Sequence, residues 1–516
     1  MDGVKAPIPE RRSRWDYTVD VVYPSSYGVY QSPIHLAYLA ATSGRCGPAL
    51  NAPFTYVDLG CGAGLTICML ADCYPQARFH GVDINPQHIA LGRDLARRSG
   101  LQNVEFHEAS FADMAGLGLP PADFVGIGGI YSWLPASLRA ACIQFVGESL
   151  ADDGVLFLHY GALPGNAQID ALYAVLRQAA GDAEGDSLAR FAHALRVVGA
   201  AAAAGARFFR LNPIAKAWIT HVGREDPRGM AHEVLNAQRA SLSVSEVAEE
   251  LGTQGLCFVA NAQCELNYLD LVAPDDLRED LGAATRLTRE ALLDLLRNTS
   301  SRMDVIMRRT APSCGAGRFD ALVFDRLNRG PLAKPRAELA RRTGVPFDGP
   351  VYTSILAVVD GRPATGAQIG ADPLCRPHGQ AAVDAAIERL TAVKLLNVLR
   401  RPYLPCGASD AAPRLASRLN ELVLEERIES RGALPFASPV AGTQLLLPLE
   451  DRLALLSMVG GDMQAAWRRI SEAGGRVTRR GAPIKDAHAL AEVAAERAER
   501  TGGDIRSVLT RLGVLA

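Results

Sequence analysis

Three closely spaced glycines and a later acid are the residues of this chain best placed to do chemistry together. The glycines follow a short apolar stretch, residues 54–59, which is typical of a buried parallel strand. Because they lack a Cβ, they let the backbone turn tightly and approach a ligand closely. A second apolar stretch, residues 77–82, ends in an acid nineteen residues beyond the last glycine, where a carboxylate can accept hydrogen bonds from a ribose diol. The pattern therefore predicts a nucleoside-cofactor site around Gly60, Gly62, Gly64 and Asp83.

The spacing of the glycines excludes some nucleoside cofactors but does not by itself identify one. The third glycine of a pyrophosphate-binding G-x-G-x-x-G loop is missing, and the sequence contains no G-x-x-x-x-G-K-S/T, so a phosphate cradle is disfavoured. The run D-L-G-C-G-A-G at residues 58–64 resembles the first motif of class I S-adenosylmethionine (SAM) methyltransferases. The resemblance implies SAM as the cofactor, with the loop against its methionine part and Asp83 on its ribose.

Further residues are expected to line the same site. Asp58 is interpreted as a support for the methionine amine, against the alternative of a carboxylate that organises the turn. Class I enzymes place an acid beside the adenine amine, and this chain has Ser110 there, followed by Phe111. The serine is interpreted as a partner of the base or as a helix start, and the phenylalanine as a stacking partner. Cys61 is expected to pack inward without chemistry. The predicted cofactor set is Asp58, Gly60, Cys61, Gly62, Gly64, Asp83, Ile84, Ser110, Phe111 and Gly128.

Alternating strands and helices position these residues. Five apolar stretches separated by helical patterns are typical of a doubly wound parallel α/β sheet. The strands are expected at residues 55–59, 78–82, 104–108, 122–127 and 154–160. The helices are expected at residues 65–73, 86–98 and 135–150, the second with Asn85 as its N-cap and Pro86 in its first turn. We therefore expect a Rossmann-like, class I methyltransferase fold for residues 1–165.

Three stretches outside the glycine loop narrow the resemblance. They are residues 27–36, residues 122–135 with I-Y-S-W-L-P at their end, and residues 159–165. Together they resemble the catalytic domain of the rickettsial outer-membrane-protein lysine methyltransferases, which also carry a methyltransferase regulatory domain. Residues 230–236 and 289–302 resemble that second domain. The resemblance implies a protein or peptide substrate with a lysine amine as the methyl acceptor.

The expected acceptor pocket contains Tyr131, Ser132 and Trp133, at the end of the fourth strand. Aromatic faces hold a cation, and the hydroxyl of Tyr131 or Ser132 can accept a hydrogen bond from an amine, so these three are the predicted catalytic residues. The alternative is that Tyr131 and Trp133 pack against the next helix. Methyl transfer is an in-line displacement that needs alignment and exclusion of water rather than a metal or a covalent intermediate.

Four positions depart from the rickettsial pattern. Gly128 and Gly161 stand where the family usually has His and Asn. Asn166 stands where it has an aromatic residue, and Ser32 where it has a His before the proline. Each departure removes a polar or aromatic contact near the expected acceptor. Two alternatives therefore stay open: a small-molecule methyltransferase, and a non-enzymatic interaction protein that keeps the fold.

At 516 residues the chain is long enough for about two to four domains. We expect a catalytic domain with an N-terminal flap at residues 1–165 and a helical insertion at residues 166–222. The regulatory domain is expected at residues 223–328, and a C-terminal α+β domain of unknown role at residues 329–516. Residues 230–309 are interpreted as a helical substrate lid or as a dimerising module, which leaves a homodimer open.

Composition argues against several other classes. The 54 basic and 56 acidic side chains form no long run of one sign, so no nucleic-acid partner is expected. No secretory signal and no membrane-spanning stretch is visible, and we expect a cytoplasmic protein. The ten cysteines include no C-x-x-C, and His232-Glu233 lacks the second histidine of H-E-x-x-H, so no metal is predicted.

Overall fold

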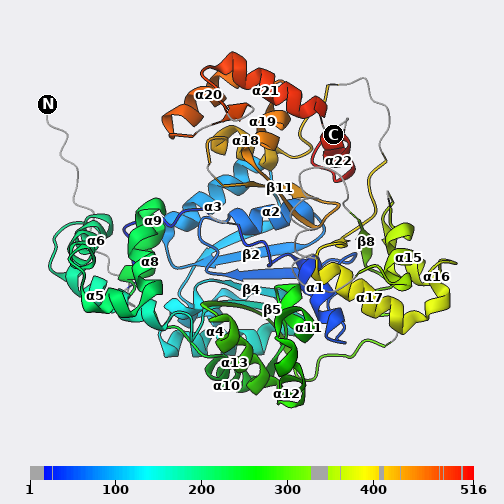
Figure 1. The fold of residues 1–516 in the computed structure, drawn as a ribbon, viewed down its shortest axis with the longest axis horizontal. Helices are drawn as coiled ribbons and strands as arrows, with labels where there is room; N and C mark the ends of the chain where they lie inside the picture. The colour runs from blue at the N-terminus through cyan, green and yellow to red at the C-terminus, as the bar shows by residue number, and fades with distance from the viewer. Residues whose placement is uncertain are drawn as a thin grey trace.

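A seven-stranded sheet runs through the centre of the computed structural model (Figure 1). The structure describes residues 17–25, 27–315, 317–326, 347–360, 362–405, 412–430, 432–475, 477–479, 482–500 and 504–516. The strand order is β3-β2-β1-β4-β5-β7-β6. Strands β1 to β5 are parallel to one another, whereas β7 is antiparallel to its neighbours β5 and β6.

The five parallel strands and the helices between them lie close to their predicted positions, which confirms the Rossmann-like α/β class. The strands are β1 (Thr55–Leu59), β2 (Arg78–Asp83), β3 (Val104–Glu108), β4 (Ala122–Gly128) and β5 (Leu150–Gly161). The helices are α1 (Pro33–Thr42), α2 (Leu65–Cys73), α3 (Pro86–Ser99) and α4 (Ala136–Ser149). The Asn85 side chain accepts a hydrogen bond from the Gln87 N–H at 2.9 Å, so it is the N-cap of α3 as predicted.

Helices cover both faces of the sheet. Helices α1, α2 and α3 pack on the face that carries Phe79 and Phe106, and α4 packs on the face that carries Val57 and Val82. Strand β1 lies between β2 and β4, so the strand order reverses there. In open sheets of this kind, ligands bind at the carboxyl ends of the strands on either side of that reversal. The fold therefore places the glycine loop and the acid after β2 at the expected ligand crevice.

Strands β6 (Leu256–Asn261) and β7 (Ser301–Arg308) complete the same sheet, although they come from the segment predicted as the regulatory domain. The register between β5 and β7 runs from Val155 opposite Met307 to Gly161 opposite Ser301. The segments predicted as separate domains at residues 1–165 and 223–328 thus share one sheet and one core. The helices around these two strands are α10 (Val244–Gly252), α11 (Leu269–Val272), α12 (Arg278–Ala283) and α13 (Arg286–Arg297).

A helical unit stands beside the sheet, formed largely by residues 166–222 (Figure 1). Its helices pack around a core of their own, which includes Leu172, Phe191 and Val234. Residues of α5 and α8 reach the cavity described below. The helices are α5 (Ala167–Gly181), α6 (Ser187–Ala203), α7 (Arg207–Leu211), α8 (Pro213–His221) and α9 (Pro227–Leu235).

The C-terminal part packs on α2 and α3, where the Tyr74 hydroxyl donates to the Gly442 carbonyl at 2.8 Å. Its strands are β8 (Val323–Asp325), β9 (Ala364–Thr365), β10 (Asn397–Leu399), β11 (Leu434–Ser438), β12 (Thr443–Leu447), β13 (Thr478–Arg479) and β14 (Ala482–Pro483). Its helices are α15 (Pro350–Val358), α16 (Gly366–Ala371), α17 (Gln380–Ala392), α18 (Arg418–Arg427), α19 (Leu449–Met458), α20 (Met463–Glu472), α21 (Ala487–Arg500) and α22 (Asp504–Arg511). The domain boundary predicted at residues 328 and 329 lies outside the described residues. Within the described ranges, the structure contains no helix long and apolar enough to cross a membrane.

Candidate functional site

The glycine loop between β1 and α2 has a conformation that depends on its glycines. Gly60, Gly62 and Gly64 have φ angles of 79°, 54° and 77°, in the left-handed region. A Cβ on Gly64 would lie 2.6 Å from the Phe106 ring, so this position also needs the space. The Gly60 N–H donates to the Val82 carbonyl at 2.7 Å, which ties the loop to the end of β2.

Asp83 holds the glycine loop in place. Its Oδ2 accepts the Gly62 N–H at 2.9 Å, and its Oδ1 accepts the Asn85 N–H at 2.8 Å and lies 3.2 Å from His88 Nδ1. Asp83 is 7% exposed and lines the cavity at the carboxyl edge of the sheet. The loop and the acid predicted from the sequence are therefore joined by direct hydrogen bonds.

Asp58 lies on the floor of the same cavity and is 3% exposed. Burial and, secondarily, the charge of Asp83 raise the pKa of the Asp58 carboxyl to about 7. An ammonium group bound beside it would favour the ionised form and lower that pKa again. This part of the site is therefore electrostatically suited to a cation.

A smaller hollow shares Gly60 and Asp83 with the main cavity. Its other walls are mostly apolar, which suits the flat face of a base. The Ser110 hydroxyl oxygen accepts the Ala112 N–H at 3.3 Å and caps the 3₁₀ turn η1 (Phe111–Leu117), so the helix-start interpretation of Ser110 is confirmed. Residues lining this hollow include Ile84, Ala109, Ser110, Phe111, Leu134 and Leu138.

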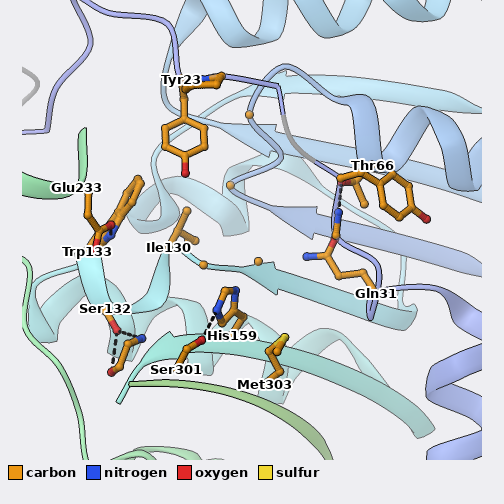
Figure 2. Close-up of a pocket in the computed structure, with 18 of the residues that line it drawn as sticks. Tyr23, Gln31, Thr66, Ile130, Ser132, Trp133, His159, Glu233, Ser301 and Met303 are labelled. Carbon is orange, nitrogen blue, oxygen red and sulfur yellow. Dashed lines mark hydrogen bonds between the residues drawn. The ribbon is translucent and has the colours of Figure 1, made fainter. Parts of the chain in front are cut away.

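The N-terminal flap closes over the loop. The Gly28 N–H donates to Thr66 Oγ1 at 3.0 Å (Figure 2). The Tyr56 hydroxyl donates to the Gln31 carbonyl at 3.2 Å. The Gln31 side chain fills the space beside Gly128, where an added Cβ would lie 2.1 Å from Gln31 Nε2. The flap glutamine thus occupies the space that a side chain at position 128 would need.

The structure separates the three predicted catalytic residues, which form the 3₁₀ turn η2 (Tyr131–Trp133) after β4. Ser132 and Trp133 line the cavity, whereas Tyr131 does not. Tyr131 is fully buried, and its hydroxyl donates to the Glu250 carboxylate of α10. For Tyr131 the packing alternative therefore applies, and it does not belong with the residues that face the cavity.

The Ser132 hydroxyl bridges the ends of β4 and β5. It accepts the Gly161 N–H at 2.6 Å and lies 3.3 Å from the Gly161 carbonyl oxygen. A Cβ on Gly161 would lie 3.2 Å from Asn166 Nδ2, which donates to the Ser300 carbonyl at 2.6 Å. An asparagine amide is therefore present beside the cavity, contributed by position 166 instead of position 161.

Trp133 is part of an aromatic wall that the sequence analysis missed. Its indole Nε1–H donates to the Glu233 carboxylate at 2.8 Å (Figure 2). Its ring centroid lies 6.3 Å from that of Tyr17 and 5.7 Å from that of Tyr23, and all four side chains line the cavity. His232 Nε2 hydrogen-bonds the backbone carbonyl between these two tyrosines, at Val21, and so anchors the segment that carries them.

His159, at the end of β5, was also missed as a site residue. Its Nε2 lies 2.7 Å from Ser301 Oγ, and burial lowers the pKa of the imidazole, which favours the neutral form near pH 7 (Figure 2). Both side chains line the cavity. A signal for His159 was available, because it stands at the carboxyl end of a predicted strand, where catalytic groups of such sheets gather.

The cavity has a volume of ≈ 890 Å³ and extends from the glycine loop to the helical unit. Tyr173 of α5 and Trp218 of α8 form its outer wall, with ring centroids 5.2 Å apart. Arg239 also lines it, but its guanidinium is already paired with Glu233 at 2.8 Å and with Asp170. The charged groups of the outer wall therefore largely neutralise one another.

A parallel sheet with a glycine loop after β1, an acid at the end of β2 and a cavity over both defines the class of nucleoside-cofactor folds to which class I methyltransferases belong. Residues 50–157 match the family described as "Methyltransferase domain", and residues 226–308 match "Predicted methyltransferase regulatory domain". The chain therefore contains a SAM-dependent methyltransferase domain and a methyltransferase regulatory domain. This confirms the cofactor and the domain pair predicted from the sequence.

Relatives cover the chain to different extents. An uncharacterized protein of Synechocystis sp. is 26% identical over 514 residues, or 96% of this chain and 99% of that protein. The trans-aconitate 2-methyltransferase of Methylobacterium nodulans is 32% identical over 133 residues, or 26% of this chain and 46% of that enzyme. PKMT2 from Rickettsia typhi, solved in complex with AdoHcy, matches 96% of this chain and 99% of its own at 15% identity, with a TM-score of 0.67. The C-terminal part thus belongs to a fold that PKMT2 shares over its length.

Proposed function

We propose that the chain transfers a methyl group from SAM to the side-chain amine of a lysine in a protein. The observation that carries this proposal is the aromatic wall of Tyr17, Tyr23 and Trp133 beside the glycine loop, with the Glu233 carboxylate against Trp133. Aromatic faces attract an ammonium group. The Glu233 carboxylate is already paired with Arg239 and with the Trp133 N–H, and it holds the Trp133 ring in place. A lysine is the protein side chain that brings such a group on a flexible stem of four carbons.

The residues around the glycine loop fit SAM. Asp58 would hold the cationic amine, because such a group relieves the cost of ionising this buried carboxyl. Asp83 would accept the ribose hydroxyls, and the hollow of Ile84, Ser110 and Phe111 would take the base. When bound, SAM supplies an electrophilic methyl group on a sulfonium.

The acceptor amine must lose a proton before it can act as a nucleophile. Burial among the rings of the cavity favours the neutral amine. We assign the role of proton acceptor to His159, because its imidazole is largely neutral near pH 7 and lines the same cavity. Trp133 and Ser132 would orient the amine, and the flap would exclude water.

The test is transfer of tritium from methyl-labelled SAM to a cell lysate by the full chain. We expect label in macromolecules, release of that label by protease, and methylated lysine after acid hydrolysis. Asp83→Ala serves as the control that should not bind SAM. Label that resists protease, or label found only in small solutes, would refute the protein-lysine proposal.

A small-molecule acceptor is the second candidate. It is favoured by the similarity of 133 residues of the chain to the trans-aconitate 2-methyltransferase of Methylobacterium nodulans. An acidic acceptor needs an unpaired cation, whereas the Arg239 guanidinium in the cavity is already paired with Glu233 and Asp170. The same labelling experiment separates the candidates, because a methylated small molecule passes an ultrafiltration membrane. Binding of SAM without transfer to either fraction would favour the interaction-protein alternative.

A further inference from the structure

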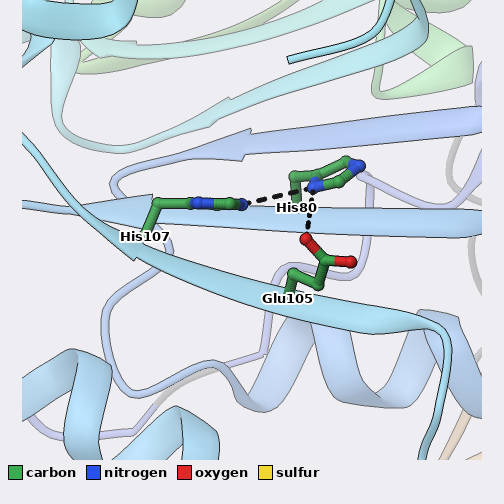
Figure 3. A group of neighbouring side chains, drawn as sticks. All are labelled: His80, Glu105 and His107. Carbon is green, nitrogen blue, oxygen red and sulfur yellow. Dashed lines mark hydrogen bonds and ion pairs between the residues drawn. The ribbon is translucent and has the colours of Figure 1, made fainter. Parts of the chain in front are cut away.

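Two histidines and a glutamate from neighbouring strands form a cluster away from the cavity. His80 is on β2, and Glu105 and His107 are on β3. The parallel register places Glu105 opposite His80 and His107 opposite Val82, so the three side chains project from the same face of the sheet. Figure 3 shows the two imidazoles and the carboxylate turned toward one another.

The distances in the cluster are close to those of a metal site. His80 Nδ1 lies 3.2 Å from His107 Nε2 and 3.8 Å from Glu105 Oε2, and all the candidate ligand atoms lie within 4.8 Å of one another. In a tetrahedral zinc site with metal–ligand bonds of about 2.0–2.1 Å, neighbouring ligand atoms are roughly 3.3 Å apart. The two nitrogens already have this separation. Only the carboxylate must move closer.

The burial of the side chains fits a site in which one nitrogen is fixed and the carboxylate is free to move. The His80 side chain is 8% exposed, which fixes one ligand, whereas the Glu105 side chain is 65% exposed and free to rotate. His80 Nε2 has no hydrogen-bond partner within the described part of the chain. The neutral ring can carry its proton on Nε2, and Nδ1 then presents its lone pair to an ion.

Metal ions bind imidazoles in their neutral form. The nearby carboxylate contributes one negative charge toward a divalent ion.

We propose that His80, Glu105 and His107 bind one divalent transition-metal ion of the zinc type, with water completing its coordination. Two imidazoles and a carboxylate are a donor set that suits zinc and disfavours magnesium or calcium, which prefer oxygen ligands. None of the three residues lines the cavity or the hollow beside it, so the ion has no contact with SAM or acceptor. It ties β3, the edge strand, to β2 just ahead of Asp83.

The test is zinc binding by the full chain after removal of metals with a chelator. Titration against a chromophoric competitor should give one ion per chain. Loss of an outer-shell partner alone weakens metal sites by about 10–100-fold, so His107→Ala should bind at least about tenfold more weakly. Zinc should also raise the melting temperature of the wild type, and it should raise that of His107→Ala by less at the same zinc concentration.

Two variants control for folding and for chance binding. Glu105→Gln changes only an exposed group, so it should weaken binding even if His107→Ala is unstable. His488→Ala is the matched control, because His488 Nδ1 lies 3.4 Å from Glu492 on an exposed helix face outside the cluster, and this variant should bind zinc as the wild type does.

Cobalt identifies the ligands by absorption. Nitrogen and oxygen ligands give weak visible bands, whereas thiolates add intense charge-transfer bands in the near ultraviolet. The Cys46 and Cys314 sulfurs lie 2.9 Å apart and are the obvious competitors. Intense thiolate bands, or zinc affinity that is the same in the wild type, His107→Ala and Glu105→Gln, would overturn the proposal.

Discussion

The substitution Asp83→Asn tests whether the acid at the end of β2 holds both the loop and the cofactor. Each carboxylate oxygen accepts a backbone N–H, Oδ2 from Gly62 at 2.9 Å and Oδ1 from Asn85 at 2.8 Å. An amide has only one acceptor oxygen, so its NH₂ group must face one of these N–H groups. A buried donor left without a partner costs about 1–3 kcal/mol, and we expect the free energy of unfolding to fall by that amount.

The same substitution should weaken SAM binding by a separate effect. A hydrogen bond to a charged group is worth about 1 kcal/mol more than one to a neutral group, so two ribose hydroxyls would lose about 2 kcal/mol. That loss corresponds to roughly 30-fold weaker binding. Isothermal titration calorimetry measures the affinity, and urea titration without SAM measures the stability.

Asp152→Asn is the matched control, because Asp152 is an exposed acid near the amino end of β5, at the opposite edge of the sheet. It should bind SAM as the wild type does. If Asp83→Asn also bound SAM with wild-type affinity, Asp83 would not hold the ribose. If its stability were unchanged, the reasoning about the two N–H groups would be refuted.

Three further predictions concern the loop, the aromatic wall and the buried acid. Gly64→Ala places a methyl group 2.6 Å from the Phe106 ring, at a residue whose φ is 77°. Urea titration should therefore show a loss of about 1–3 kcal/mol in the free energy of unfolding. An unchanged urea midpoint would contradict this. Trp133→Phe keeps an aromatic face but removes the N–H that donates to Glu233. We therefore expect kcat/KM for the acceptor to fall about tenfold, with the affinity for SAM unchanged. A loss of SAM affinity instead would count against the role of Trp133 in binding the acceptor. Asp58 has a pKa of about 7 in the folded chain against 3.8 ordinarily, so its stabilising contribution is complete below about pH 4 and is lost as the pH rises through 7. Without SAM, Asp58→Asn should therefore lose less stability than the wild type between about pH 4 and 8, and parallel pH profiles in urea titrations would rule this out.

Elements with local signals were predicted closely from the sequence. Strand β1 and helix α2 have the bounds expected, because an apolar run and the glycine loop mark their ends within a few residues. Strand β5 begins at Leu150, four residues before its predicted start at residue 154. Its first residues include Asp152 and Asp153, and the register with β4 shifts there, so no apolar run marks the beginning.

The acceptor side was harder to predict for a geometric reason. The sequence places Tyr131, Ser132 and Trp133 together, but in a 3₁₀ turn successive side chains point about 120° apart. Three consecutive residues of such a turn cannot all face one cavity, and the turn buries Tyr131. The cavity is completed instead by Tyr17 and Glu233, which lie far from the turn in the sequence. No short sequence pattern predicts contacts between residues that are so far apart in the chain.

The histidine and glutamate cluster illustrates the same limit. The sequence has no C-x-x-C and no H-E-x-x-H, so its short, regular spacings predict no metal. His80 is separated from Glu105 and His107 by a whole helix, and only the pairing of β2 with β3 brings the three together. Cross-strand ligand sets require the register, which the apolar pattern fixes only once the strand order is known.

The pairing of β5 with β7 has a consequence for how this protein can be divided. In a fragment that ends near residue 165, β5 would become an exposed edge strand. The backbone N–H and C=O groups that now pair with β7, from Val155 to Gly161, would have no partner. Much of that strand is apolar and buried. Long, apolar strands with open backbone groups recruit other chains and aggregate. We therefore expect the catalytic segment, residues 1–165, to be insoluble when it is produced alone. The segment matched as a regulatory domain covers this edge of the sheet, so it cannot be removed or exchanged as a module.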